Sequence, residues 1–67
     1  MKGFWRHDNG KMYVVESDTF GQITGAAGPV DDLHDLQGYV CKPAIVDWVK
    51  QAIAARKLHR VNLASAR

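Results

Sequence analysis

Asp8-Asn9-Gly10-Lys11-Met12-Tyr13-Val14-Val15-Glu16 is the stretch that decides the fold of this chain. Asn-Gly tolerates the positive φ angles of a type I′ turn, and the β-branched and aromatic residues after it favour a strand. The sequence therefore predicts a β-hairpin with a two-residue loop at Asn9-Gly10. This loop fixes the strand partners as Arg6 with Tyr13, Trp5 with Val14 and Phe4 with Val15.

A second turn is expected at Asp18-Thr19-Phe20-Gly21, where Asp first and Gly fourth suit a type I turn with an αL bulge residue. A loop of three or five residues places Ile23 with Tyr13 and Val15, whereas a loop of four places it on the other face. We prefer the odd length because it builds the more apolar face. That face holds Phe4, Tyr13, Val15 and Ile23, and the opposite face holds Trp5, Met12, Val14 and Thr24.

A hairpin that is apolar on both faces needs cover on both faces. One face is assigned to a C-terminal helix. The other requires the segment after Gly28, a second copy of the chain, or a ligand.

The rest of the chain supplies that helix. Glycine and proline at 25–29 are expected to end the sheet, and a helical turn is expected near 31–36, capped by Asp31 or Asp32. Pro43 suits a helix start, and an apolar stripe follows it at three- and four-residue spacing. The stripe consists of Ile45, Trp48, Val49, Ala52, Ile53 and Arg56. Residues 61–63 fit either a short strand or a tail.

The predicted fold is α+β: a small three-stranded antiparallel β-meander packed by one C-terminal α-helix. We expect one domain over 1–67, with the meander at 1–28, a loop with a short helical turn at 29–42, the helix at 43–58 and a tail at 59–67. Strands are expected near 4–7, 11–16 and 22–26.

Size and composition indicate a small folded domain: 67 residues, 46% hydrophobic and 24% charged. A domain this small is stable by about 3–5 kcal/mol, and the single cysteine, Cys41, forms no internal disulfide. No stretch has the length of a transmembrane helix, and the N-terminus lacks the apolar region of a signal peptide. We expect a cytoplasmic protein without membrane association.

The leading functional hypothesis is a non-enzymatic protein-interaction or self-associating module, acting as a homodimer or with a protein partner. It depends on the second apolar face, and its contact residues are Trp5, Met12 and Val14.

Charge distribution supplies the alternative hypothesis. Residues 12–41 hold five acids and no Lys or Arg, whereas residues 42–67 hold six bases and one acid. A basic helix end can neutralise nucleic-acid phosphates. The predicted nucleic-acid contacts are Lys2, Arg56, Lys57 and Arg60.

Neither a catalytic set nor a cofactor is expected. Asp31, Asp32, His34 and Asp35 are carboxylates and an imidazole of the kind that bind divalent metals, but a solvated capping turn is the preferred interpretation, so no metal site is predicted. Cys41 near a helix N-terminus would have a lowered pKa. A small enzyme or thiol-reactive protein using Cys41 is therefore the third functional class, although a small buried residue is the commoner role there.

Two stretches, residues 10–21 (Gly-Lys-Met-Tyr-Val-Val-Glu-Ser-Asp-Thr-Phe-Gly) and residues 42–49 (Lys-Pro-Ala-Ile-Val-Asp-Trp-Val), resemble short uncharacterised bacterial proteins. The resemblance implies a bacterial, soluble, stand-alone domain and carries no active site. The order of three strands and a helix is also similar to the DNA-binding modules at the N-termini of tyrosine recombinases. Here the sheet region holds no Lys or Arg after Lys11, which argues against insertion of the sheet into the major groove.

Overall fold

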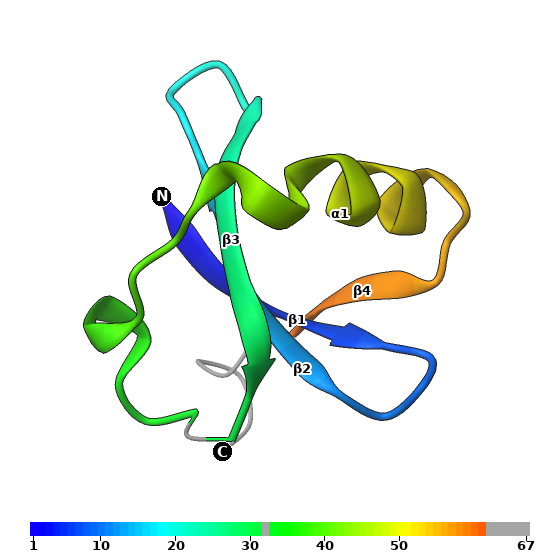
Figure 1. The fold of residues 1–67 in the computed structure, drawn as a ribbon, viewed down its shortest axis with the longest axis horizontal. Helices are drawn as coiled ribbons and strands as arrows, with labels where there is room; N and C mark the ends of the chain where they lie inside the picture. Colours follow the sequence, from blue (N-terminus) through cyan, green and yellow to red (C-terminus); the bar gives the residue numbers. More distant parts are fainter. Residues whose placement is uncertain (32, 62–67) are drawn as a thin grey trace.

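Antiparallel strands form one sheet in the computed structural model, which describes residues 1–31 and 33–61 (Figure 1). The strands are β1 (Lys2–His7), β2 (Met12–Ser17), β3 (Ile23–Val30) and β4 (Leu58–Val61), in the order β3-β2-β1-β4. Short 3₁₀ turns, η1 (Leu36–Gly38) and η2 (Pro43–Ile45), precede the helix α1 (Val46–Ala54). The predicted α+β class is confirmed, but the described part of the chain has four strands where the prediction had three.

The first hairpin has a three-residue loop, not the predicted two-residue loop. The N–H of His7 donates to the carbonyl of Lys11 at 2.9 Å, and the N–H of Gly10 donates to the carbonyl of His7 at 2.9 Å. Gly10 has a φ of 90° and acts as the bulge residue. The register therefore shifts by one residue, so that Trp5 lies opposite Tyr13 and Phe4 and Trp5 exchange faces.

The second hairpin confirms the predicted odd loop. The N–H of Asp18 donates to the carbonyl of Gln22 at 2.9 Å, and Gly21 has a φ of 82°. These bonds enclose a three-residue loop. Ile23 consequently packs on the same side as Tyr13 and Val15, as predicted.

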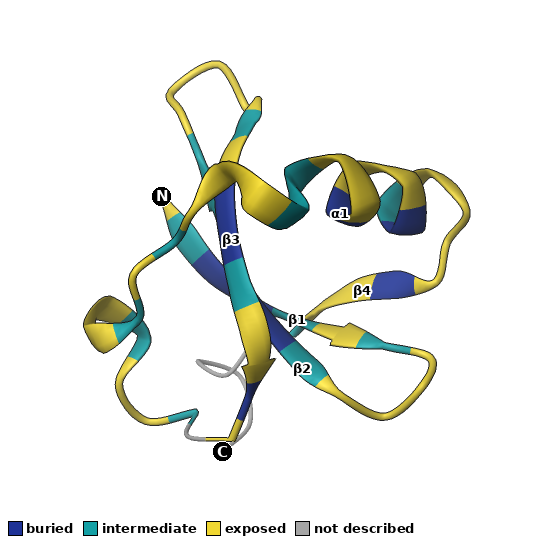
Figure 2. Ribbon diagram, in the orientation of Figure 1, coloured by how far each residue is buried: buried dark blue, intermediate teal, exposed yellow. Residues whose placement is uncertain are grey.

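One face of the sheet packs against α1, whose buried side faces the strands (Figure 2). Val49 is fully buried there, and Ala52 is nearly so. The core on this side consists of Tyr13, Val15, Ala26, Val49, Ala52 and Leu58, with Trp5, Ile23, Ile45 and Ile53 partly buried against it.

The opposite face is covered by the segment that follows β3. Phe4, Val14 and Val30 are buried on this side, and Leu33, Leu36 and Tyr39 pack over them. The ring of Tyr39 meets that of Phe4 edge-on, with centroids 6.5 Å apart. The sequence left three possible covers for this face: the segment after Gly28, a second copy of the chain, or a ligand. The chain's own segment covers it, which weakens the case for a required partner.

β3 continues to Val30, beyond the end predicted at residue 26. Val30 pairs with Met12 after a register irregularity, so the strand passes through Gly28 and Pro29. Proline is tolerated because β3 is an edge strand. The helical turn η1 also starts later than predicted, and Asp35 caps it by accepting the N–H of Gly38 at 3.0 Å.

α1 ends at Ala54, before the predicted end at residue 58, because the chain reverses at Arg56. Arg56 has a φ of 59°, the left-handed conformation. The N–H of Lys57 donates to the carbonyl of Ala52 at 2.8 Å, and the N–H of Arg56 donates to that of Ile53 at 3.0 Å. These two bonds form a Schellman motif.

This reversal directs Leu58 into the core and starts β4, which pairs with β1. The tail predicted at 59–67 is therefore a strand at residues 59–61. Residues 62–67 lie outside the described part of the chain, as does Asp32.

Candidate functional site

An aromatic cluster lies where α1 crosses the end of β1. The rings of His7 and Trp48 are stacked, with centroids 5.2 Å apart and planes 14° from parallel. Tyr13 supports the same indole at 5.1 Å and 47°. Tyr13 is buried, whereas Trp48 is 42% exposed. Trp48 is thus held by two rings while part of its surface faces solvent.

A surface pocket of about 360 Å³ adjoins this cluster. His7, Trp48, Gln51, Ala52, Ala55 and Lys57 line it. Because Ala52 and Ala55 carry only methyl groups, they leave the space beside the indole open. The pocket combines an aromatic surface, an amide, an imidazole and the Lys57 ammonium, with no carboxylate among its lining residues.

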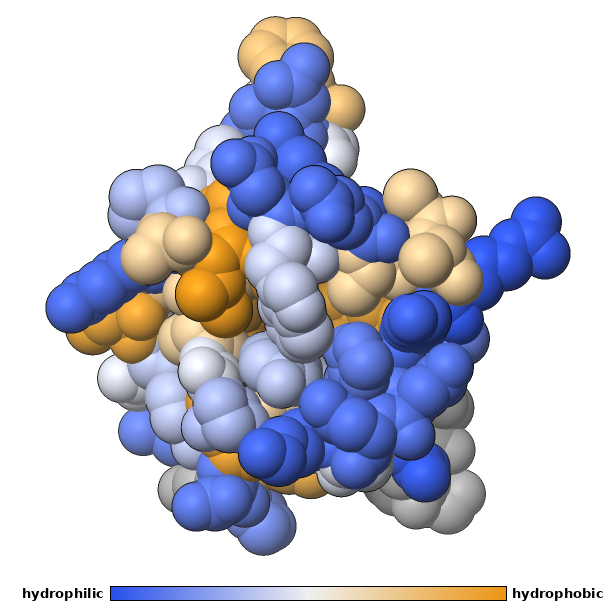
Figure 3. Space-filling model, turned by 45° about the vertical axis from the view of Figure 1, so that its right-hand side comes forward, coloured by the Kyte–Doolittle hydropathy of each residue, from blue (hydrophilic) through white to orange (hydrophobic). Residues whose placement is uncertain are grey.

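The turn beside this pocket carries basic side chains. Arg56 and Lys57 form the turn after α1, and Arg6 and Lys11 flank the β1–β2 turn. Asp8 adds a negative charge, but its Oδ1 lies 3.0 Å from Nε2 of His59. Figure 3, which brings this side of the molecule forward, shows hydrophilic side chains over much of it.

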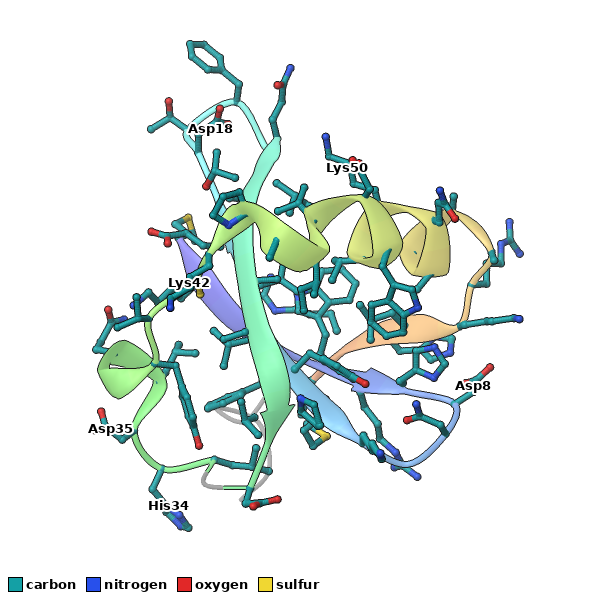
Figure 4. The ribbon with its side chains drawn as sticks, viewed as in Figure 1. Asp8, Asp18, His34, Asp35, Lys42 and Lys50 are labelled. Carbon is teal, nitrogen blue, oxygen red and sulfur yellow. The ribbon has the colours of Figure 1, made fainter. Side chains whose placement is uncertain are left out.

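The labelled charges of Figure 4 are spread over the molecule. In Figure 4, Asp8 lies at the β1–β2 turn, and Lys50 rises from the middle of α1. Asp18 lies on the projecting β2–β3 loop, and Asp35 lies beside η1 on the same side of the molecule as Lys42. Asp18 and Asp35 thus lie away from the basic turn at Arg56 and Lys57, whereas Asp31 lines a pocket with Lys11.

The structure brings together only part of the predicted nucleic-acid set. Arg56 and Lys57 are adjacent and exposed, and Lys57 lines the pocket. Arg60 belongs to β4, and its guanidinium lies so close over Gly3 that a Cβ there would be 2.7 Å from it. Lys2 is apart from them, since its Nζ donates to the carbonyl of Tyr39 at 2.7 Å.

Trp48 and His7 were absent from the predicted site. The sequence places Trp48 on the apolar stripe of the helix, whose simplest role is to pack against the core. Val49, the next residue of the stripe, is fully buried and faces the sheet, so Trp48 lies at the edge of the stripe. The width of the stripe was therefore the signal that one of its members is partly exposed. For His7, the signal was its place beside the first turn, but the stacking depends on tertiary contact.

The three residues predicted to bind a partner are not a joint surface. The side chain of Val14 is fully buried, so it is inaccessible to any partner of the folded chain. The register shift also separates the other two: Trp5 packs against the helix-side core, and Met12 packs against the opposite core. The prediction that these three residues form one contact surface is therefore wrong, because the observed register places them on different faces.

Cys41 has the opposite of the expected thiol chemistry. Burial raises its pKa, an effect that the nearby Lys2 charge only partly offsets, and Glu16 raises it further. The thiol also precedes α1 by several residues, because the chain first forms η2. The prediction of a lowered pKa for Cys41 is therefore wrong.

Residues 1–31 and 33–61 contain no group of three or more His, Cys, Asp or Glu side chains placed to hold a metal ion. Asp32 of the acidic turn is outside the described residues. Within the described ranges, the helices are also too short and too polar to cross a membrane.

Comparison with family models, with curated proteins and with solved structures gives no match for this chain. The site is therefore interpreted from its own chemistry.

Proposed function

We propose that this protein is a small non-enzymatic nucleic-acid-binding module that uses the basic turn beside Trp48. The observation that carries the proposal is the half-exposed Trp48, stacked on His7 and bordered by Lys57. Aromatic rings set among basic side chains are typical of surfaces that bind nucleic acid through stacking and phosphate neutralisation.

The basic side chains supply affinity in this proposal. Arg56 and Lys57 project from a tight turn held by the two Schellman hydrogen bonds, so their backbones are fixed before binding. Each phosphate neutralised releases condensed counterions, which makes the binding sensitive to salt.

Binding to mixed pools of DNA and RNA, at salt from about 50 to about 200 mM, tests the proposal. We expect an affinity that falls steeply with salt and that Lys57→Glu weakens. Lys42→Glu makes the same charge change just before η2, at the far end of α1, and serves as the matched control. Absence of salt-sensitive binding to every pool would sink the proposal.

The bacterial origin and cytoplasmic location expected from the sequence belong to the same proposal. They are supported by the resemblance of residues 10–21 and 42–49 to short bacterial proteins and by a lone unpaired cysteine. Nucleic acid is accessible to a protein in that compartment.

Self-association is a second candidate function, favoured by the exposed hairpin tip. Phe20 is 89% exposed in the loop that projects between β2 and β3 (Figure 1), and Met1 is 83% exposed. The two residues lie at the same end, since the N–H of Ser17 donates to the carbonyl of Met1 at 2.8 Å. Exposed apolar side chains at one end of a molecule can pair with their own copies about a two-fold axis.

Sedimentation over a range of concentrations tests this second candidate. We expect a mass above the 7.5 kDa monomer that is insensitive to salt and is lost in Phe20→Ser. A monomer at all concentrations removes the candidate.

A further inference from the structure

We infer that the nucleic acid bound is single-stranded, and that one unpaired base enters the pocket beside Trp48. This inference rests on the proposed function and adds to it the class of ligand. The evidence for it is the shape and lining of the pocket. These features are independent of the positive charges that attract a phosphate backbone.

The pocket has the dimensions and chemistry for a planar, polar ring. Its volume of about 360 Å³ falls within the range of small-molecule sites. His7 stacks on one face of the Trp48 indole and Tyr13 contacts the same ring, so the solvent-exposed part of the indole offers a π surface that is already held in place. Ala52 and Ala55 leave room for the ring over the helix surface.

The lining also includes polar side chains. Gln51 carries an amide, which both donates and accepts hydrogen bonds and so matches the edge of a base. Lys57 also lines the pocket and follows Arg56 in the basic turn, and its charge suits the phosphate attached to that base. Stacking is tolerant of sequence because every base has a π face.

A duplex does not satisfy this arrangement. Its bases are stacked and paired inside the helix, so only its phosphates would reach the basic turn. An unpaired strand meets both parts of the site, the phosphate contacts and the stacking surface. The structure therefore assigns strand selectivity to Trp48 and the open space beside it, and general affinity to Arg56 and Lys57.

The test compares an oligothymidylate of about 12 nucleotides, a duplex of equal length and inorganic polyphosphate as ligands. Trp5→Phe provides a background in which fluorescence reports Trp48. We expect the single strand to quench this fluorescence and to bind roughly tenfold more tightly than the duplex. Polyphosphate should bind in a salt-sensitive manner without a stacking signal.

Two variants probe the pocket separately from the charge. Trp48→Ala removes the stacking surface, and Ala55→Leu fills the space without removing an aromatic ring. Both should cost roughly tenfold in single-strand affinity and less than about twofold for the duplex. Ala54→Leu, an exposed alanine one residue earlier, is the matched control. Ala55→Leu keeps the test valid even if Trp48→Ala impairs folding.

The outcomes separate the two proposals. Equal affinity for the single strand and the duplex, together with unchanged binding by Ala55→Leu, overturns the single-strand inference. The protein would then be a phosphate-binding module. Absence of salt-sensitive binding to all three ligands overturns the proposed function as well.

Discussion

Arg56 has a backbone conformation that most residues avoid. Its φ of 59° places it in the left-handed region at the position where a Schellman motif usually carries glycine. The left-handed region costs an L-residue roughly 1–2 kcal/mol because Cβ approaches the backbone carbonyl. Retaining arginine here is consistent with a role for its charge, as the proposed function requires.

Arg56→Gly should therefore stabilise the fold while weakening nucleic-acid binding. Relief of the left-handed strain, less the larger entropy of glycine in the unfolded chain, gives a net gain of about 0.5–1 kcal/mol. Urea denaturation measures it. Ala55→Gly is the control, because Ala55 has a φ of −82° and gains nothing from glycine. A loss of stability in Arg56→Gly contradicts the backbone argument.

Cys41 should be a slow nucleophile. Because burial raises its pKa, the thiolate is scarcer at any pH below that pKa, and the rate of alkylation should rise only at higher pH than for an ordinary thiol. Iodoacetamide labelling across pH, with the urea-unfolded chain as reference, measures this. Equal rates in the folded and unfolded chains would show that the thiol is neither protected nor shifted.

The first turn shows what local sequence determines and what it leaves open. Asn-Gly correctly predicted a hairpin, but the same pair fits a two-residue turn or a type I turn with a glycine bulge. The longer loop is supported by a bond from the N–H of Lys11 to Oδ1 of Asn9 at 2.8 Å, and by one from the N–H of Asp8 to the carbonyl of Lys57 at 2.8 Å. The second bond joins residues distant in sequence, which no local pattern reveals.

At the scale of elements, the helix and the second hairpin followed from periodicity and turn chemistry, whereas β4 did not. Residues 58–61 read Leu-His-Arg-Val, a strand too short to show a period. It forms because Arg56 reverses the chain and β1 offers an unpaired edge. The candidate site could likewise be predicted only in part, because sequence shows local clusters but not tertiary contacts. Arg56 and Lys57 form a local cluster, whereas Trp48 and His7 meet only when α1 packs on the sheet.

Leu58→Ala should show that β4 is integral to the fold. Leu58 is 3% exposed in the helix-side core, and removing such a side chain costs about 2–5 kcal/mol. That is comparable to the roughly 3–5 kcal/mol expected for the whole domain, so the variant should be largely unfolded by circular dichroism.

His59→Ala, on the same strand, provides the comparison for Leu58→Ala. Its exposed pair with Asp8 contributes only about 0–1 kcal/mol. A folded Leu58→Ala protein with the stability of His59→Ala would show that β4 is an accessory strand.

At the scale of the whole molecule, the two ends of the sheet offer different chemistry. The end with the α1 C-terminus carries the Arg56–Lys57 turn and the aromatic pocket, and the end with the β2–β3 loop exposes Phe20. β2 has six residues and separates the two turns by about 20 Å at the usual strand rise. α1 covers one face of the sheet and the segment after β3 covers the other, so neither function needs the buried faces.

This separation predicts that the two ends act independently. Lys57→Glu should lower single-strand affinity and leave the sedimentation of the free protein unchanged, whereas Phe20→Ser should do the reverse. In the double variant the two effects should add within about 0.5 kcal/mol, because sites this far apart with no shared partner are seldom coupled. Titration and sedimentation of all four proteins measure both quantities. Weakened nucleic-acid binding in Phe20→Ser would instead mean that the strand reaches along the whole sheet to the hairpin tip, so that the basic turn is one part of a longer binding surface.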